Sequence, residues 1–334
     1  MNNQSEAEKQ LTYEEFVEKM RGALSIIFGP SYNCELIKQK KTDAHELDTI
    51  AITKVFREPL KSSSDEQHIS TYSVNVYTEE EYRNYLEGEK FGDVMRKVVA
   101  SIERTEGHGT LSAVVQTITD LYSYEGTKDR LIIRAIGYET SKEMLKDFVF
   151  RKIGDIALVL YALTIQEAYS MASMKVSKTI AGDWGVSFDE ALDAALRNTQ
   201  EKFPPRLMPL EELIAAGLKI PSKNNDFNLL DPGFRFKRSR FDTYLFTDSH
   251  AMNGATAFFY PGIQQKLGEL FFEDYYMVPT SIKEVMLHPV STTKLAFVRE
   301  QAAASSNDMG LKPEEILSKS VYKYTRSLDK LAML

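Results

Sequence analysis

Cysteine is almost absent from this chain of 334 residues, because Cys34 is the only one. A lone thiol cannot form an internal disulfide, which excludes a disulfide-stapled secreted scaffold and favours a cytoplasmic location. The longest uncharged apolar run, residues 156–166, is far shorter than the roughly 20 residues that a membrane-spanning helix needs. The polar start of the chain also lacks the apolar stretch of a signal peptide. We therefore expect neither export nor a membrane partner.

Signature motifs of several enzyme classes are missing as well. The sequence contains no G-x-x-x-x-G-K phosphate loop, no G-x-G-x-x-G, no G-x-S-x-G and no H-E-x-x-H. A single cysteine cannot build a structural zinc site, and the five histidines are scattered singly: His45, His68, His108, His250 and His288. We expect no metal and no cofactor.

The remaining composition is that of an ordinary folded protein. Hydrophobic residues make up 43% of the chain, and 48 acidic against 41 basic residues give a net charge of −7. This balance does not favour a protein built around duplex nucleic acid, although it leaves room for a local basic patch. The length fits one large domain or two packed ones.

Helix signals are clearest in the first third of the chain. Thr12 and Glu15 have the spacing of a capping box, and the helix that they predict ends at Gly29-Pro30. Thr78 and Glu81 repeat this spacing, and an apolar stripe over residues 91–102 predicts a further helix. Between them, three β-branched and aromatic stretches predict an antiparallel meander: residues 34–38, 49–56 and 70–77.

In the rest of the chain, strand and helix signals follow one another without the regular alternation of a βαβ repeat. We expect paired strands over 148–162 and 168–177, and a helix capped by Ser187 and Glu190. Asn253-Gly254 lies between two β-rich stretches and predicts a type I′ turn in a hairpin over residues 243–260. Further expected elements are helices at 111–121, 263–271 and 294–304 and from Pro313, strands at 131–136, 275–278, 285–288 and 321–325, a cap at Ser281/Glu284, and an irregular loop at 219–233.

These signals together predict an α+β fold, with antiparallel sheets built from hairpins and short interspersed helices. We expect an N-terminal α+β subdomain over residues 1–145 and a C-terminal α+β subdomain over residues 146–334. One continuous domain is the alternative.

Several sequence blocks resemble those of a known family. The main block contains Asn253-Gly254-Ala255, Tyr260-Pro261-Gly262 and residues 276–285. Weaker likeness covers the first predicted helix and residues 150–157, 184–187, 208–213, 313–318 and 321–322. The chain resembles a set of uncharacterised proteins from anaerobic, gut-associated Gram-positive bacteria, which form a domain of unknown function. The resemblance implies a bacterial cytosolic protein and brings no mechanism. It marks Asn253, Gly254, Pro261 and Pro279 as structural signature residues, and Lys283 stands where many relatives are expected to have histidine.

The polar residues of the main block offer one catalytic hypothesis. If His250 or His288 reached Ser281, and Asp248 or Glu284 oriented the imidazole, hydrolase-like chemistry would follow. The structural alternative is the simpler one, because Ser281 and Glu284 have capping spacing and Asn253 is a typical turn residue.

A short basic and aromatic segment offers a second hypothesis. In Phe234–Phe241, three phenylalanines alternate with four basic residues, Arg235, Lys237, Arg238 and Arg240. This combination suits nucleic acid, whose phosphates attract the charges and whose bases stack on the rings. The alternative interpretation is a half-buried edge strand whose basic side chains prevent edge-to-edge aggregation.

The function that we expect is a non-enzymatic protein-interaction or regulatory module whose partner is another protein. Aromatic pairs such as Phe271-Phe272 and Tyr275-Tyr276 are typical of a core or an interface. The hydrolase and the nucleic-acid binder are the alternatives.

Overall fold

A computed structural model gives the fold for residues 10–28, 32–43, 45–59, 67–107, 120–121, 123–166, 171–217, 227–308 and 310–334. The chain divides into two compact units. The first unit comprises residues 1–41 and 46–116, and the second comprises residues 42–45 and 117–334. Residues 117–145, which the sequence analysis placed in the N-terminal subdomain, group with the second unit.

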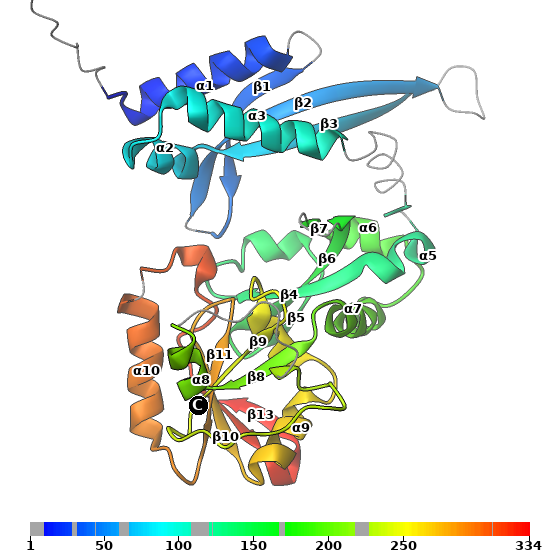
Figure 1. Cartoon of the computed structure of the whole chain (residues 1–334). Helices are drawn as coiled ribbons and strands as arrows, with labels where there is room; N and C mark the ends of the chain where they lie inside the picture. Colours follow the sequence, from blue (N-terminus) through cyan, green and yellow to red (C-terminus); the bar gives the residue numbers. More distant parts are fainter. Residues whose placement is uncertain are drawn as a thin grey trace, which may run out of the picture. The chain divides into compact units, whose positions relative to one another are not determined.

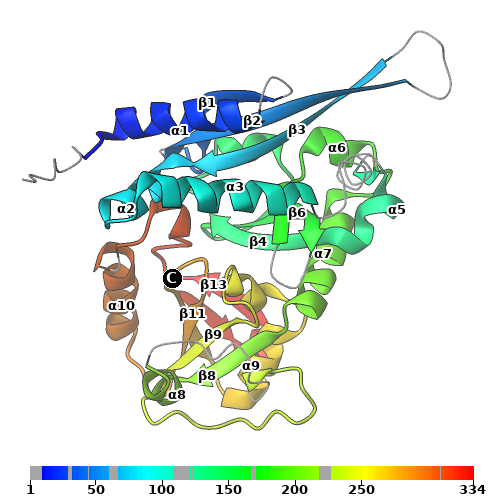
Figure 2. The same ribbon diagram turned by 45° about the horizontal axis from the view of Figure 1, so that its top comes forward.

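The first unit is a three-stranded sheet with helices along one face. The strands pair antiparallel in the order β1-β2-β3, which confirms the meander. Figures 1 and 2 show α1 and α3 running along this sheet. The elements of this unit are α1 (Tyr13–Phe28), β1 (Asn33–Lys40), β2 (Glu46–Pro59), β3 (Gln67–Tyr77), α2 (Thr78–Leu86) and α3 (Phe91–Gly107).

The amphipathic pattern of α1 explains how this unit forms its core. The capping box is present, because Thr12 N–H donates to the Glu15 carboxylate at 2.9 Å and Glu15 N–H donates to the Thr12 hydroxyl at 3.3 Å. One face of α1 then packs against the sheet and α3. The buried core residues are Phe16, Val17, Met20, Leu24, Cys34, Ile50, Ile52, Val76, Val94, Met95, Val98 and Ile102.

The cap predicted at Thr78 is wrong. Tyr77 is the N-cap residue of α2, and Thr78 is the first residue of the helix. Its buried hydroxyl donates to the Asp48 carbonyl at 3.0 Å and lies 2.6 Å from the Tyr13 hydroxyl. Contacts with β2 and α1 therefore occupy the oxygen that would have capped the helix.

The second unit contains two sheets. In the smaller one, β6 pairs with β4 on one side and with β5 and β7 on the other. The pairing of β6 with β7 confirms the expected paired strands, but the stretch expected as one strand over 148–162 is divided between β5 and β6, which pair with each other. Ser187 caps α7 as predicted, accepting from Glu190 N–H at 3.1 Å. The elements of this part are α5 (Tyr124–Thr127), β4 (Leu131–Gly137), β5 (Phe150–Ile153), β6 (Ile156–Gln166), β7 (Met171–Lys175), α6 (Lys178–Gly182) and α7 (Phe188–Lys202), with short 3₁₀ turns η2 (Lys128–Arg130) and η3 (Met144–Asp147).

The larger sheet has six antiparallel strands in the order β13-β12-β10-β11-β9-β8 (Figure 1). Residues of both sheets, of η5 and of α9 share one extensive buried core. The elements of this part are β8 (Pro205–Pro209), α8 (Leu210–Ala215), β9 (Tyr244–Asp248), η5 (Gly254–Phe259), α9 (Ile263–Phe271), β10 (Tyr275–Pro279), β11 (Val285–Pro289), α10 (Leu295–Asp308), η6 (Pro313–Glu315), β12 (Tyr322–Thr325), η7 (Arg326–Leu328) and β13 (Lys330–Met333).

The hairpin predicted over residues 243–260 is wrong. After β9 the chain enters a loop and then the 3₁₀ helix η5, and Asn253 has a φ of −131°, outside the left-handed region that a type I′ turn requires. Gly254 has another role. A Cβ there would collide with the Thr247 hydroxyl and would lie 2.7 Å from Asp248 N, so the missing side chain lets the loop pass against β9.

Three other expectations also need correction. The Ser281/Glu284 spacing belongs to the turn between β10 and β11, and not to a helix. Pro313 opens a single 3₁₀ turn in place of the expected last helix, and β13 follows the strand that was predicted to be last. Most of the helix expected at 111–121, and residues 219–226 of the irregular loop, lie outside the described residues.

The α+β class with antiparallel sheets is confirmed. None of the helices in the described ranges is long and apolar enough to span a bilayer. The two-subdomain organisation, in the sense of parts that fold independently, remains a prediction.

Candidate functional site

Ser281 and Glu284 lie together in the tight turn between β10 and β11. The Ser281 hydroxyl donates to Glu284 Oε1 at 3.1 Å and accepts from Lys283 N–H at 3.0 Å. Ser281 is buried, and its described hydrogen bonds include no histidine. A serine that donates its proton to a carboxylate within its own turn stabilises that turn, and among the described residues no imidazole is hydrogen-bonded to it as a base.

His250 lies in the loop after β9 and has different neighbours. Its Nδ1 is 2.9 Å from the Ser249 hydroxyl, and its ring meets Phe203 edge-on at 5.0 Å between centroids. Asp248 does not orient this imidazole. Its Oδ1 instead accepts the backbone N–H groups of His250 and Ala251, at 2.8 and 2.6 Å. Burial raises the pKa of Asp248 and these two hydrogen bonds oppose the shift, so the carboxylate mainly shapes the loop.

His288 on β11 is fully buried, away from solvent. Its Nδ1 lies 3.2 Å from the Thr243 hydroxyl, and its ring packs edge-on against Phe297. Burial lowers its pKa to about 4, so the imidazole is neutral near pH 7. Gln301 lies close enough to oppose this shift, although its geometry falls short of a hydrogen bond to Nε2.

The space beside His250 is too small for a substrate. It has a volume of about 20 Å³, which is room for one water molecule, and its lining includes Asp248, Asn253 and Arg134 but neither Ser281 nor Glu284. The hydrolase hypothesis therefore remains a prediction without support from this geometry.

The signature residues occupy structural positions. Asn253 and Gly254 precede and begin η5, and Pro261 follows η5 directly before Gly262, the residue that caps α9. Pro279 is the last residue of β10.

Two of the four basic side chains in the 234–241 segment pair with acidic side chains of the same unit. Lys237 pairs with Glu212 of α8 at 3.1 Å, and Arg238 lies 3.9 Å from Asp242. Glu211 accepts the backbone N–H of Arg240 at 2.9 Å. The Arg235 guanidinium donates to the carbonyl of its own neighbour Phe234. Lys237 and Arg238 thus have acidic partners that compete with phosphate.

Two of the aromatic rings in this segment belong to the core. Phe236 stacks on Tyr244 at 5.6 Å and meets Phe271 at 5.8 Å, and Phe234 packs against the same cluster. The segment is not a strand in the structure. Of its three phenylalanine rings, only that of Phe241 is largely exposed. Bases would find few free rings here, so nucleic-acid binding also remains a prediction.

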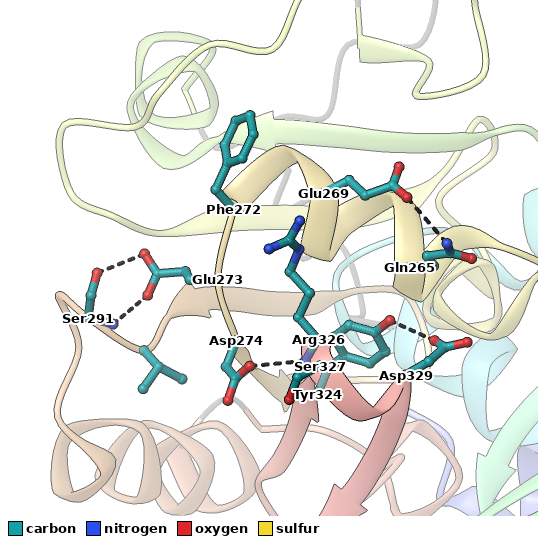
Figure 3. A pocket seen from close by; sticks show the side chains of 11 residues that line it. Gln265, Glu269, Phe272, Glu273, Asp274, Ser291, Tyr324, Arg326, Ser327 and Asp329 are labelled. Atoms are coloured by element: carbon teal, nitrogen blue, oxygen red, sulfur yellow. Dashed lines mark hydrogen bonds between the residues drawn. The ribbon is translucent and has the colours of Figure 1, made fainter.

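A much larger depression, of about 630 Å³, lies where the end of α9 meets the ends of the central strands (Figure 3). Its wall comes from three separate stretches of the chain. The lining residues are Gln265, Glu269, Phe272, Glu273, Asp274, Val290, Ser291, Tyr324, Arg326, Ser327 and Asp329.

The floor of this depression includes a buried, hydrogen-bonded tyrosine, and its rim carries an exposed aromatic ring. Tyr324 is buried and stacks on Tyr275 with 5.1 Å between centroids, and its hydroxyl donates to Asp329 at 2.6 Å. Burial and this hydrogen bond raise the pKa of Tyr324 far above its usual range. Phe272 ends α9 in a left-handed conformation with a φ of 61°, and 80% of it is exposed.

The carboxylates around the depression are engaged within the protein. Glu273 accepts the N–H and hydroxyl of Ser291 at 2.6 and 2.7 Å. Asp274 pairs with Lys323 at 2.8 Å, which lowers the pKa of Asp274, and also accepts the Arg326 N–H. Glu269 accepts from Gln265 at 3.3 Å.

The Arg326 side chain extends along α9, and its Cγ lies 3.5 Å from the position that a Cβ on Gly268 would take (Figure 3). Its guanidinium belongs to no ion pair among the described residues. Four carboxylates against this one arginine leave the lining negative. The described residues offer no group of three histidine, cysteine or carboxylate side chains placed to hold a metal ion.

A comparison with models of protein families identifies the family of this chain. The model of a family of unknown function (DUF5688) matches residues 13–326, which is most of the sequence. The chain belongs to this family. No curated protein and no solved structure matches it.

The family match covers the lining residues up to Arg326, whereas Ser327 and Asp329 lie beyond it. Sequence reasoning did not locate this site. Its one signal was the aromatic pair Phe271-Phe272, which fits a core or an interface equally well, and the structure gives the two rings different roles. Phe271 packs on the core, whereas Phe272 points outward.

Proposed function

We propose that this DUF5688 protein is a non-enzymatic protein-interaction module, and that the depression beside α9 receives a segment of its partner. The observation that carries the proposal is Phe272, an aromatic side chain that is 80% exposed at the rim of a depression of about 630 Å³. Exposed aromatic side chains beside a concavity are typical anchors of protein interfaces, since covering them removes a large apolar area from water. The cytoplasmic, bacterial setting expected from the sequence is part of this proposal.

The charge of the lining indicates the chemistry of the partner. Four carboxylates and one arginine line the depression, so a segment with a lysine or arginine is favoured over an acidic one. The charge of Asp274 is balanced by Lys323. The other three carboxylates, Glu269, Glu273 and Asp329, accept hydrogen bonds from uncharged donors, which hold them in place and leave their negative charge for an incoming cation.

A library of random 16-residue peptides displayed on phage tests this proposal. The full-length protein is the bait, and the Phe272→Ser variant is used to remove peptides that bind elsewhere. Phe188→Ser is the matched control, because Phe188 is an exposed phenylalanine at the start of α7, outside the depression.

We expect the selected peptides to be basic, to bind the Phe188→Ser variant as they bind the wild type, and to bind the Phe272→Ser variant at least tenfold more weakly. Binding should weaken as salt is added, because the attraction to the carboxylates is screened. Failure to select any peptide that depends on Phe272, or selection of an acidic consensus, would overturn the proposal.

A further inference from the structure

We infer that the partner segment binds as an extended strand along the outer edge of β13, and that a basic residue at one end of it enters the adjoining depression. This inference rests on the proposed function and names the form of the ligand. Adding a strand to an exposed sheet edge is a common mode of peptide recognition, in which main-chain hydrogen bonds supply affinity.

The outer edge of β13 is open in the structure. Among the described strands, β13 pairs only with β12, with Tyr322 opposite Met333 and Tyr324 opposite Leu331. Leu334 N–H donates to the Val321 carbonyl at 2.9 Å. This bond makes Leu334 and Val321 a hydrogen-bonded pair. Hydrogen-bonded and non-hydrogen-bonded pairs alternate along an antiparallel ladder, so Met333 and Leu331 are in non-hydrogen-bonded pairs with β12. The N–H and C=O groups of these two residues therefore point away from β12, toward an incoming strand.

The opposite edge of the same sheet, β8, is blocked against an added strand, so β13 is the edge of this sheet that can accept one. β8 begins at Pro205 and ends at Pro209, and proline lacks the N–H that an added strand would need. Asn228 also forms a bridge with Arg206 on this side, and Leu229 N–H donates to the Pro205 carbonyl. β13 has none of these protections, and Lys330 is its only charged side chain.

The surroundings of β13 specify what the added strand should contain. Leu328, Met333 and Leu334 are 70%, 50% and 45% exposed, so apolar side chains on the incoming strand would cover them. The edge and the depression are continuous, because Asp329 lines the depression and directly precedes β13. A strand that runs past Lys330 therefore reaches the negative lining, where a lysine or arginine fits.

A second copy of this chain fits the same edge less well. A two-fold antiparallel pairing centred on Ala332 would place Lys330 of one copy opposite Leu334 of the other. That position is at the end of β13 away from Asp329, so β13 of the second copy would bring no positive charge to the depression.

The test measures how the peptides selected above bind to edge variants of the full-length chain. Met333→Pro removes an N–H that faces outward, so the ladder with β12 is retained and peptide binding should weaken at least tenfold. Ala332→Pro is the matched control. Its N–H faces β12, so this variant should lose thermal stability where Met333→Pro keeps that of the wild type.

A second measurement leaves the protein unchanged and so does not depend on folding of a variant. Single N-methylation at each peptide position should abolish binding at every second residue, because only alternate N–H groups of an added strand face β13. Loss of binding with this period of two, together with sensitivity to Met333→Pro, supports strand addition.

Two results would overturn strand addition. In the first, peptide binding requires Phe272 but is unchanged in Met333→Pro and shows no period of two in the N-methylation series. The proposed function would then hold, but the peptide would bind in a form other than an added strand. A peptide-free dimer in light scattering that becomes a monomer in Met333→Pro would assign the edge to a second copy. Failure to select Phe272-dependent peptides is the separate outcome that overturns the proposed function itself.

Discussion

His288 is a buried side chain through which pH acts on the stability of this fold. Burial on β11 lowers its pKa from the usual 6.5 to about 4. The unfolded chain therefore binds this proton more readily than the folded chain, and stability must rise with pH across the interval. The stabilisation is complete above pH 6.5 and is lost as the pH falls toward 4.

We expect the free energy of unfolding to decrease by about 2 kcal/mol between pH 7 and pH 5 through this residue alone. The His288→Asn variant removes the titrating group, so its stability should depend less on pH by that amount. Urea unfolding of both proteins at the two pH values measures the difference. Parallel pH profiles would contradict the assignment, because the other titrating groups are common to both proteins.

Gly254 is needed for a close approach between two parts of the backbone. A Cβ there would collide with the Thr247 hydroxyl and approach Asp248 N to 2.7 Å, and both atoms belong to β9, which cannot easily move.

We expect Gly254→Ala to destabilise the protein by about 1–3 kcal/mol, the usual cost of overpacking. Gly182→Ala is the matched control, since a Cβ at the end of α6 meets nothing within 4 Å. That variant should be neutral or slightly more stable. Equal melting temperatures for the two variants would show that the loop after β9 yields to the added methyl group.

At the scale of elements, a serine or threonine followed three residues later by glutamate caps a helix at some positions and not at others. Thr12 and Ser187 cap helices as predicted, whereas Thr78 and Ser281 do not. The local pattern is the same in all four cases. The difference comes from contacts distant in sequence, because Thr78 is held by Asp48 of β2 and Ser281 lies between two paired strands.

Ser187→Ala should cost about 1 kcal/mol of stability, because the N–H of Glu190 loses its acceptor at the start of α7. Ser187→Asp should restore most of the loss, since aspartate accepts the same hydrogen bond and its charge suits a helix N-terminus. Chemical unfolding of the three proteins provides the comparison. A neutral Ser187→Ala variant would mean that tertiary packing alone determines where α7 begins.

At the scale of the whole molecule, the first unit has the parts of an independent domain. Its described residues form a three-stranded sheet, the helices α1, α2 and α3, and a buried core around Phe16, Met20 and Ile50. About 100 residues are enough for such a domain to fold alone.

We expect a fragment of residues 1–116 to fold and to unfold cooperatively. Thermal unfolding followed by circular dichroism would measure this, and dispersed amide resonances for β1–β3 would confirm the sheet. A fragment with the spectrum of an unfolded chain would show that this unit depends on the rest of the molecule.

The candidate site illustrates why the sequence was sufficient for some features and insufficient for others. The depression draws residues from 265–274, from 290–291 and from 324–329, and no sequence spacing links these stretches. The polar residues that the sequence did place together, such as His250 and Ser281, have separate hydrogen-bond partners in the fold. Residues near in sequence share a site only if the register of the strands brings their side chains to one surface.

By itself, the sequence determined the α+β class, the meander, the helix from Tyr13 and the cap of α7, because local periodicity and local hydrogen bonds fix these features. Only the tertiary structure decided which strands lie at the sheet edges, that Gly254 serves a close approach, and that Phe272 points outward while Phe271 points inward. These outcomes depend on which surfaces remain uncovered after long-range packing, a quantity that no short stretch of sequence contains.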